Sequence, residues 1–127
     1  MYSKKTLERF SNPSYAGGLR GADATGKGEL GNEVVKIYIT VDEDGMIDTA
    51  KFKAYGGVCT IVASDIACEI IEGKSLEHAL TVNANEIMDE IDDECREDSC
   101  KIVEEAIKDA VEDYYKKKEK ELKKANK

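Results

Sequence analysis

The sequence contains no tryptophan and only two phenylalanines among its 127 residues. It therefore offers no aromatic platform for stacking bases. The net charge of −8 also argues against general nucleic-acid binding, which relies on basic surfaces. No apolar run approaches the roughly 18 residues needed to cross a bilayer, and no secretory signal is recognisable. We therefore expect a soluble cytoplasmic protein that binds neither nucleic acid nor membranes.

Histidine is also scarce, because His78 is the only one. It is far in sequence from every cysteine except Cys68, and nothing near it has the spacing of a metal ligand. We expect His78 to lie at the surface. Since no Ser/His/Asp set is recognisable either, the sequence predicts a protein that is not an enzyme.

The length predicts a single domain over 1–127 with a substantial core. Apolar periodicity predicts a helix over 2–10, strands over 34–41 and 46–55, helices over 58–72, 75–80 and 83–91, and a long helix from about Cys100. A short edge strand is expected near 26–30. This order predicts an α+β fold, in which helices pack on one face of a small antiparallel sheet. The lysine-rich tail, 116–127, is too polar to bury and is expected to fray.

Cys59 stands at the most informative corner of the chain. A strand ends at Tyr55, Gly56 and Gly57 allow a tight turn, and a largely apolar helix follows. The unpaired N–H groups and the dipole of a helix N-terminus favour a thiolate there. The alternative is that Cys59 is a small apolar residue of the core, since free cysteines are often buried.

The four cysteines favour thiol, metal or redox chemistry over a disulfide scaffold, given the absence of a secretory signal. Cys59 and Cys68 lie about 13 Å apart along one helix, on opposite sides, so Cys68 is assigned to the core. Cys100 is expected to start the last helix, where the dipole again favours a thiolate. Cys95 lies close enough in sequence to join Cys59 and Cys100 at one shallow site. No CxxC pair is present, so a zinc knuckle is not expected.

Residues 86–98 carry eight acidic side chains against one arginine, Arg96. Such a run is usually a solvated surface. The alternative is a docking patch for a basic partner.

Five segments of the chain, taken in order, carry a resemblance to a known family. They are MYSKKTLERFSNP (1–13), GELGN (28–32) with VVKI (34–37), IDTAKFKAYG (47–56), EGKSL (72–76) and CKIVEEAI (100–107). In these segments the sequence resembles the IscU/NifU N-terminal family, the scaffold proteins of iron–sulfur cluster assembly. The resemblance implies a compact α+β domain with a three-stranded sheet. It also implies that cysteines and an aspartate at one end receive sulfur from a cysteine desulfurase. These ligands then hold a [2Fe–2S] cluster or, in some members, zinc.

The sequence departs from this family at the ligands. The family's Pro-x-Cys-Gly-Asp loop is missing, because Glu33 runs directly into the first long strand. The family's second cysteine corresponds to Gly57, and Cys59 stands two residues later. Cys100 matches the third cysteine. The Leu-Pro-Pro-Val-Lys chaperone motif is replaced by the acidic segment 92–98, which contains Cys95.

Three hypotheses follow from the resemblance and its gaps. The first is a variant assembly protein that carries iron, sulfur or a labile [2Fe–2S] cluster, with Cys59 and Cys100 as ligands or persulfide acceptors and Cys95 and Asp98 completing the set. Its partners would be a cysteine desulfurase and cluster-accepting proteins, and a second subunit could supply ligands across a homo-oligomer. The second is a metal-free docking or regulatory module. The third is a zinc-binding sulfur acceptor.

Overall fold

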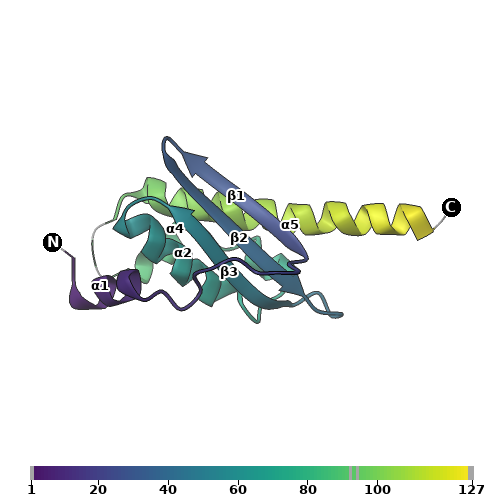
Figure 1. Ribbon diagram of the computed structural model, residues 1–127, viewed down its shortest axis with the longest axis horizontal. Helices are drawn as coiled ribbons and strands as arrows, with labels where there is room; N and C mark the ends of the chain where they lie inside the picture. Colours follow the sequence, from purple (N-terminus) through teal and green to yellow (C-terminus); the bar gives the residue numbers. More distant parts are fainter. Residues whose placement is uncertain (1, 92, 94, 126–127) are drawn as a thin grey trace.

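The structure is a computed structural model that describes residues 2–91, 93 and 95–125 (Figure 1). The elements are α1 (Lys4–Ser11), β1 (Ala24–Leu30), β2 (Glu33–Val41), β3 (Ile47–Tyr55), α2 (Val58–Ile71), α3 (Leu76–Ala79), α4 (Ala84–Asp89) and α5 (Glu97–Ala125). Every predicted helix and strand is present, with most ends shifted by one to three residues. Of the sequence segments discussed above, Met1, Asp92, Glu94 and 126–127 lie outside the described residues.

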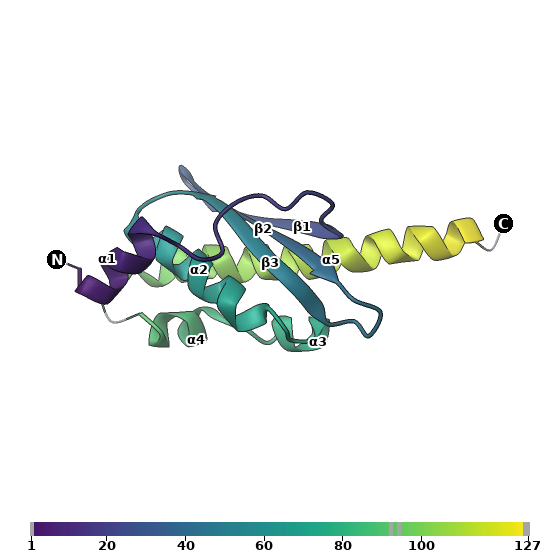
Figure 2. The ribbon, with the colours of Figure 1, turned by 60° about the horizontal axis from the view of Figure 1, so that its bottom comes forward.

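The three strands form one antiparallel sheet in the order β1-β2-β3. The helices cover one face of this sheet, with α2 and α5 lying against it (Figure 2). Val35, Ile37 and Ile39 of β2 point to these helices and are fully buried, as their alternation with polar residues predicts. The predicted α+β class and the three-stranded sheet are confirmed.

β1 is longer than the short edge strand expected from the sequence, because two glycines let it approach α5. A side chain on Gly26 would collide with the backbone of Ala106 and Ala110, and one on Gly28 with the backbone of Ile102. The outer edge of β1 is also occupied. The backbone N–H groups of its residues 25 and 27 donate to carboxylates of α5, at 2.9 Å each. The two glycines and the α5 carboxylates therefore secure this edge strand.

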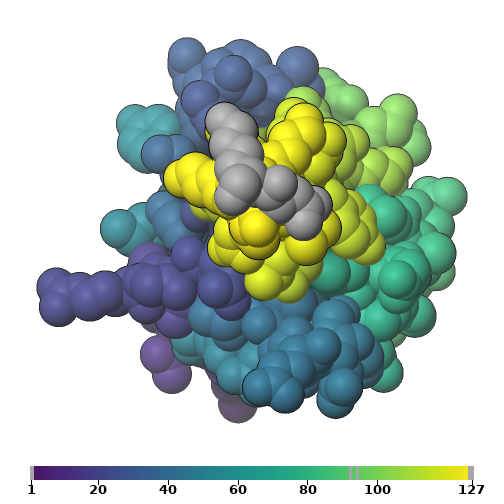
Figure 3. Space-filling model, turned by 90° about the vertical axis from the view of Figure 1, so that its right-hand side faces the viewer, coloured from purple at the N-terminus to yellow at the C-terminus, as the bar shows by residue number. Residues whose placement is uncertain are grey.

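α5 is the longest element, with 29 residues. Its buried residues end at Val111, Asp113 and Tyr114 still contact the domain, and the last turns project from it (Figures 1 and 3). The helix stays regular to Ala125, so fraying of the lysine-rich tail remains a prediction. No helix in the described part of the chain, α5 included, is long and apolar enough to cross a membrane.

Candidate functional site

The corner between β3 and α2 is built as the sequence predicts, but for a different reason. β3 ends at Tyr55 and α2 begins at Val58. Gly57 is the N-cap residue with an extended backbone, φ −78° and ψ −174°, and Gly56 also avoids the left-handed region. The predicted need for unusual backbone angles is therefore wrong. A Cβ at Gly56 would instead lie 2.8 Å from a carboxylate oxygen of Glu33, so a larger residue there would require the Glu33 side chain to shift.

Cys59 is the second residue of α2 and forms a disulfide with Cys95. The two Cα atoms lie 5.7 Å apart, although 36 positions separate the residues in sequence. Cys95 belongs to the non-helical segment before α5, so the bond joins this segment to the start of α2. The structure thus brings together two of the predicted site residues. It joins them covalently, whereas the sequence analysis expected free thiols.

Cys100 differs most from expectation. α5 begins three residues earlier than predicted, at Glu97, so Cys100 lies within the first turn on the inner side of the helix and is 0% exposed. Burial raises the pKa of its thiol to about 11, and the nearby Glu97 carboxylate acts in the same direction. Cys100 therefore does not face the shallow site expected from the sequence. Cys68 is buried in the core as predicted, and burial raises the pKa of its thiol further still.

The fourth predicted ligand, Asp98, is partly exposed and lies 3.4 Å from the guanidinium of Arg96. Among the described residues, no group of three or more His, Cys, Asp or Glu side chains is placed to hold a metal ion. An iron–sulfur cluster and a zinc ion both require thiolates as sulfur ligands, and a disulfide supplies none. With Cys59 and Cys95 bonded and Cys100 buried, the predicted ligand set does not fit either cargo in this state.

Glu33 is a site residue that the sequence analysis missed. It is the first residue of β2, and the register of β2 with β3 places it beside the glycine corner. One carboxylate oxygen accepts hydrogen bonds from the Thr60 hydroxyl, at 2.6 Å, and from the Gly57 backbone N–H, at 3.2 Å. Glu33 therefore ties the first strand of the central hairpin to the start of α2. The only signal in the sequence is its position opposite Gly56 in an expected hairpin.

A pocket of about 280 Å³ opens beside the disulfide. Glu33, Cys59 and Thr60 line it from the corner, Arg96 from the segment before α5, and Ser99 from the first turn of α5. It therefore contains one carboxylate, one guanidinium and the sulfur of Cys59. A space of this size holds a few water molecules or a small polar group.

The acidic segment before α5 has a structural contact. Both carboxylate oxygens of Asp93 accept from the backbone N–H of Ser3, at 2.9 and 3.1 Å. Hydrogen bonds from Thr6 and from this N–H hold the pKa of Asp93 below its usual range. This carboxylate therefore anchors the beginning of α1, so part of the acidic run does more than face solvent. Asp92 and Glu94, which belong to the same predicted docking patch, lie outside the described residues.

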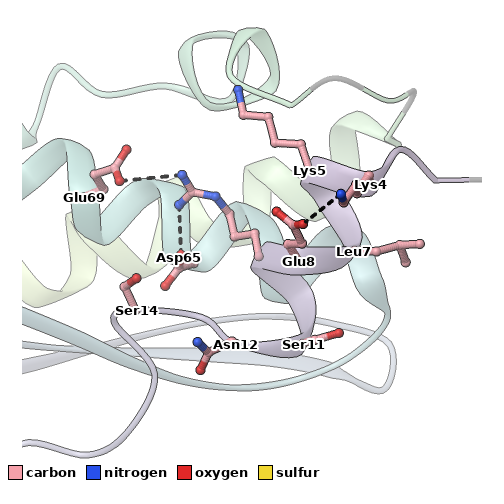
Figure 4. A pocket seen from close by; sticks show the side chains of 10 residues that line it. Lys4, Lys5, Leu7, Glu8, Ser11, Asn12, Ser14, Asp65 and Glu69 are labelled. Carbon is pink, nitrogen blue, oxygen red and sulfur yellow. Dashed lines mark hydrogen bonds and ion pairs between the residues drawn. The ribbon is translucent and has the colours of Figure 1, made fainter.

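A larger pocket, of about 940 Å³, lies between α1 and α2 (Figure 4). The Arg9 guanidinium crosses it and contacts Asp65 at 2.8 Å and Glu69 at 3.5 Å. Asp65 is almost fully buried and also accepts from the backbone N–H of Tyr15 at 2.8 Å. These paired charges attach α1 to the domain. The pocket contains no cysteine, so we do not place the sulfur chemistry there.

The sequence of this chain is similar to a known protein family and to several of its members. The family model of the NifU-like N terminal domain matches residues 1–121. The chain is 37% identical over 123 residues to "Iron-sulfur cluster assembly scaffold protein IscU" of Buchnera aphidicola subsp. Acyrthosiphon pisum, covering 92% of this chain and 97% of the relative. It is 34% identical over 124 residues to the protein of the same name from Escherichia coli K12, covering 93% and 97%.

Solved structures agree on the fold. The N-terminal part of a nitrogen-fixing NifU-like protein from Brucella abortus superimposes with a TM-score of 0.70 at 14% identity, covering 91% of this chain and 94% of that one. A scaffold protein for the SUF system from Fervidobacterium islandicum gives 0.66 at 17% identity, covering 87% and 96%. The predicted family and fold are confirmed, and the predicted scaffold-like function agrees with the names of the relatives. By sequence along nearly its whole length, and with a fold to match, this chain belongs to the family of NifU-like N-terminal domains.

Proposed function

We propose that this protein acts in iron–sulfur cluster assembly in the cytoplasm, as a scaffold-type protein that accepts sulfur on Cys59. Family membership supports the process, because the relatives are named as assembly scaffolds. The observation that carries the assignment to Cys59 is its place in the first turn of α2, beside a pocket and in reach of a second cysteine. In this role the protein is not an enzyme in its own right.

The chemistry requires the reduced protein. Once the disulfide is opened, the N-terminal position of Cys59 in α2 favours its thiolate. A thiolate can take the outer sulfur from a persulfide, and accepting sulfur needs only one such group. A cysteine desulfurase is the donor of matching chemistry, and cluster-accepting proteins are the downstream partners.

Iron and the cluster are cargo of the process. A [2Fe–2S] cluster, iron or zinc would need the thiolates of Cys59 and Cys95 together with ligands beyond them, since Cys100 is buried. Asp98 or a second subunit are the candidates for those ligands. We place sulfur acceptance first because it requires only the reduced Cys59, whereas cargo binding also requires further ligands to assemble.

The test is sulfur transfer under anaerobic conditions. The reduced protein, freed of reductant, is mixed with a cysteine desulfurase and cysteine, and the adducts are located by mass spectrometry. We expect one added sulfur on the Cys59-containing peptide of Cys95→Ser, and none at that position in Cys59→Ser. Failure of Cys95→Ser to acquire sulfur, with a donor shown to be active on another acceptor, would contradict the proposal. It would favour the second candidate, a metal-free docking module whose disulfide is structural.

A further inference from the structure

The disulfide between Cys59 and Cys95 assigns a second activity to this site. We infer that the protein releases the sulfur it has accepted as sulfide, and that Cys95 performs the release by forming this disulfide with Cys59. The inference rests on the proposed function, because it begins from a persulfide on Cys59. It adds a reductive step, for which the chain itself supplies both electrons.

The reaction balances within the two cysteines. The Cys95 thiolate attacks Sγ of the Cys59 persulfide, and a bond forms between the two Sγ atoms. The bond from Cys59 Sγ to the outer sulfur breaks, and that sulfur departs with its proton as HS⁻. The outer sulfur is reduced to the level of sulfide, and the two cysteines are oxidised to the disulfide. The protein product of the step is the covalent state seen in the structure.

The geometry required for this attack is present in the fold. The two Cα atoms lie 5.7 Å apart, within the range that lets two cysteine sulfurs bond without movement of the backbone. Cys59 and Cys95 are both partly exposed, so a donor protein can deliver sulfur and sulfide can leave. The other two cysteines are buried in the core and cannot replace Cys95.

The roles of the two cysteines follow from their surroundings. Cys59 is held in the first turn of a regular helix and lines the pocket, which suits the residue that receives sulfur. Cys95 lies outside the helices and does not contribute to the pocket lining, which suits the attacking residue. The pocket beside Cys59 offers room for the outer sulfur. Attack by Cys95 in line with the bond to the outer sulfur breaks that bond as the Cys59–Cys95 bond forms.

The cytoplasmic location proposed above also favours this reaction. In reducing cytoplasm, disulfides are usually transient and belong to catalytic or redox-sensing cycles. A cycle of this kind needs a reductant, and we name a protein dithiol of the thioredoxin class. The dithiol gives two electrons and two protons to Cys59 and Cys95, and it becomes a disulfide itself. The reduced pair can then accept the next sulfur.

The experiment follows sulfide and disulfide together. Reduced wild-type protein without free reductant is mixed with a cysteine desulfurase and a limiting amount of cysteine under anaerobic conditions. Sulfide is trapped with a bimane reagent and the disulfide is quantified by mass spectrometry. We expect one sulfide for each Cys59–Cys95 disulfide formed. Cys95→Ser should keep the persulfide on Cys59 and release about tenfold less sulfide.

Two controls fix the baseline. The desulfurase alone measures the sulfide that the donor releases by itself, and Cys68→Ala, which changes a buried core cysteine, should release sulfide as the wild type does. Circular dichroism confirms that each variant is folded. The equality of sulfide and disulfide in the wild-type protein is a readout that does not depend on any variant.

The outcomes separate the two proposals. Persulfide that persists on Cys59 of the wild-type protein, with sulfide at the donor baseline and no new disulfide, overturns the release step and leaves sulfur acceptance intact. Sulfide release that is equal in the wild type and Cys95→Ser also overturns it. Absence of persulfide on Cys59 of the folded Cys95→Ser variant, with an active donor, overturns the proposed function itself.

Discussion

Two regions of this molecule are held together in different ways. The contact between β1 and α5 depends on Gly26 and Gly28, where any side chain would collide with the helix backbone. The region around Cys59 and Cys95 is held by one disulfide and by the hydrogen bonds of the Glu33 carboxylate. The packing contact involves main-chain atoms along two long elements, whereas the reactive region depends on a few partly exposed side chains.

The difference shows why the two regions should respond differently to substitution. A fold maintained by many buried contacts tolerates change at an exposed corner, because surface substitutions cost little stability. The same corner carries the proposed chemistry, since the position of Cys59 decides which sulfur it can reach. The predictions below disturb one region at a time.

The largest expected effect is at the packing contact. Gly28→Ala places a methyl group against the backbone of Ile102, which cannot move aside as a side chain would. We expect the free energy of unfolding to fall by about 3 kcal/mol, the upper end of the usual cost of inserting a group into a packed contact, measured by urea denaturation. The matched control is Gly57→Ala, because a Cβ there meets open space and the backbone is extended. An equal loss in both variants would contradict this account of the contact.

Opening the disulfide should have the next largest effect. It closes a loop between residues 36 positions apart, so reduction enlarges the unfolded ensemble. We expect the oxidised protein to be about 3 kcal/mol more stable than the reduced protein in parallel urea titrations. Cys95→Ser should have the stability of the reduced protein and should not respond to reductant. If the wild-type protein were equally stable when oxidised and when reduced, the disulfide would contribute nothing to the stability of the fold.

A smaller, pH-dependent effect on stability is expected at Glu104 of α5. Its carboxylate accepts from the Lys108 ammonium, at 2.9 Å, and from the Ala84 backbone N–H, at 2.8 Å. These donors hold the pKa of Glu104 below its usual range, with the Lys108 hydrogen bond the larger cause. A lowered pKa gives stability above the unfolded-state value, near 4.3, which is lost as the pH falls through the folded-state pKa.

Glu104→Gln should therefore cost about 1 kcal/mol at neutral pH, because it removes the charge and keeps the shape. The difference in unfolding free energy between the variant and the wild type should disappear as the pH falls through the pKa of Glu104. Urea titrations at a series of pH values measure this difference. If the difference in unfolding free energy between wild type and Glu104→Gln stayed constant into the acid range, the lost stability would be due to packing and not to charge.

The last and smallest expected effect is a difference in alkylation rate among the cysteines of the reduced, folded protein. Cys59 and Cys95 should react readily with iodoacetamide near pH 8. Cys100 should react more slowly, because a thiol of pKa about 11 has roughly a hundredfold smaller thiolate fraction there than an ordinary cysteine. Peptide mapping after timed quenching measures the rates, and denaturation in urea should equalise them. Fast labelling of Cys100 in the folded state would place it at the surface, as the sequence first predicted.

The sequence predicted most of the fold because the fold depends on local patterns. The alternation in β2 and the glycines before α2 are visible in neighbouring residues. The site could be predicted less well. Cys100 precedes Val103 by three residues and Ile107 by seven, so it shares their face of α5 and is buried with them, although its place near the start of the helix had predicted an exposed site.

By itself, the sequence determined the family, the order of the elements and the presence of a cysteine at the start of α2. These follow from periodicity and from motifs that lie within short stretches of chain. Only the tertiary structure decided that Cys59 meets Cys95, that Glu33 holds the corner and that Cys100 is buried. Each of these depends on segments distant in sequence that pack against each other, and such packing is set by the whole core.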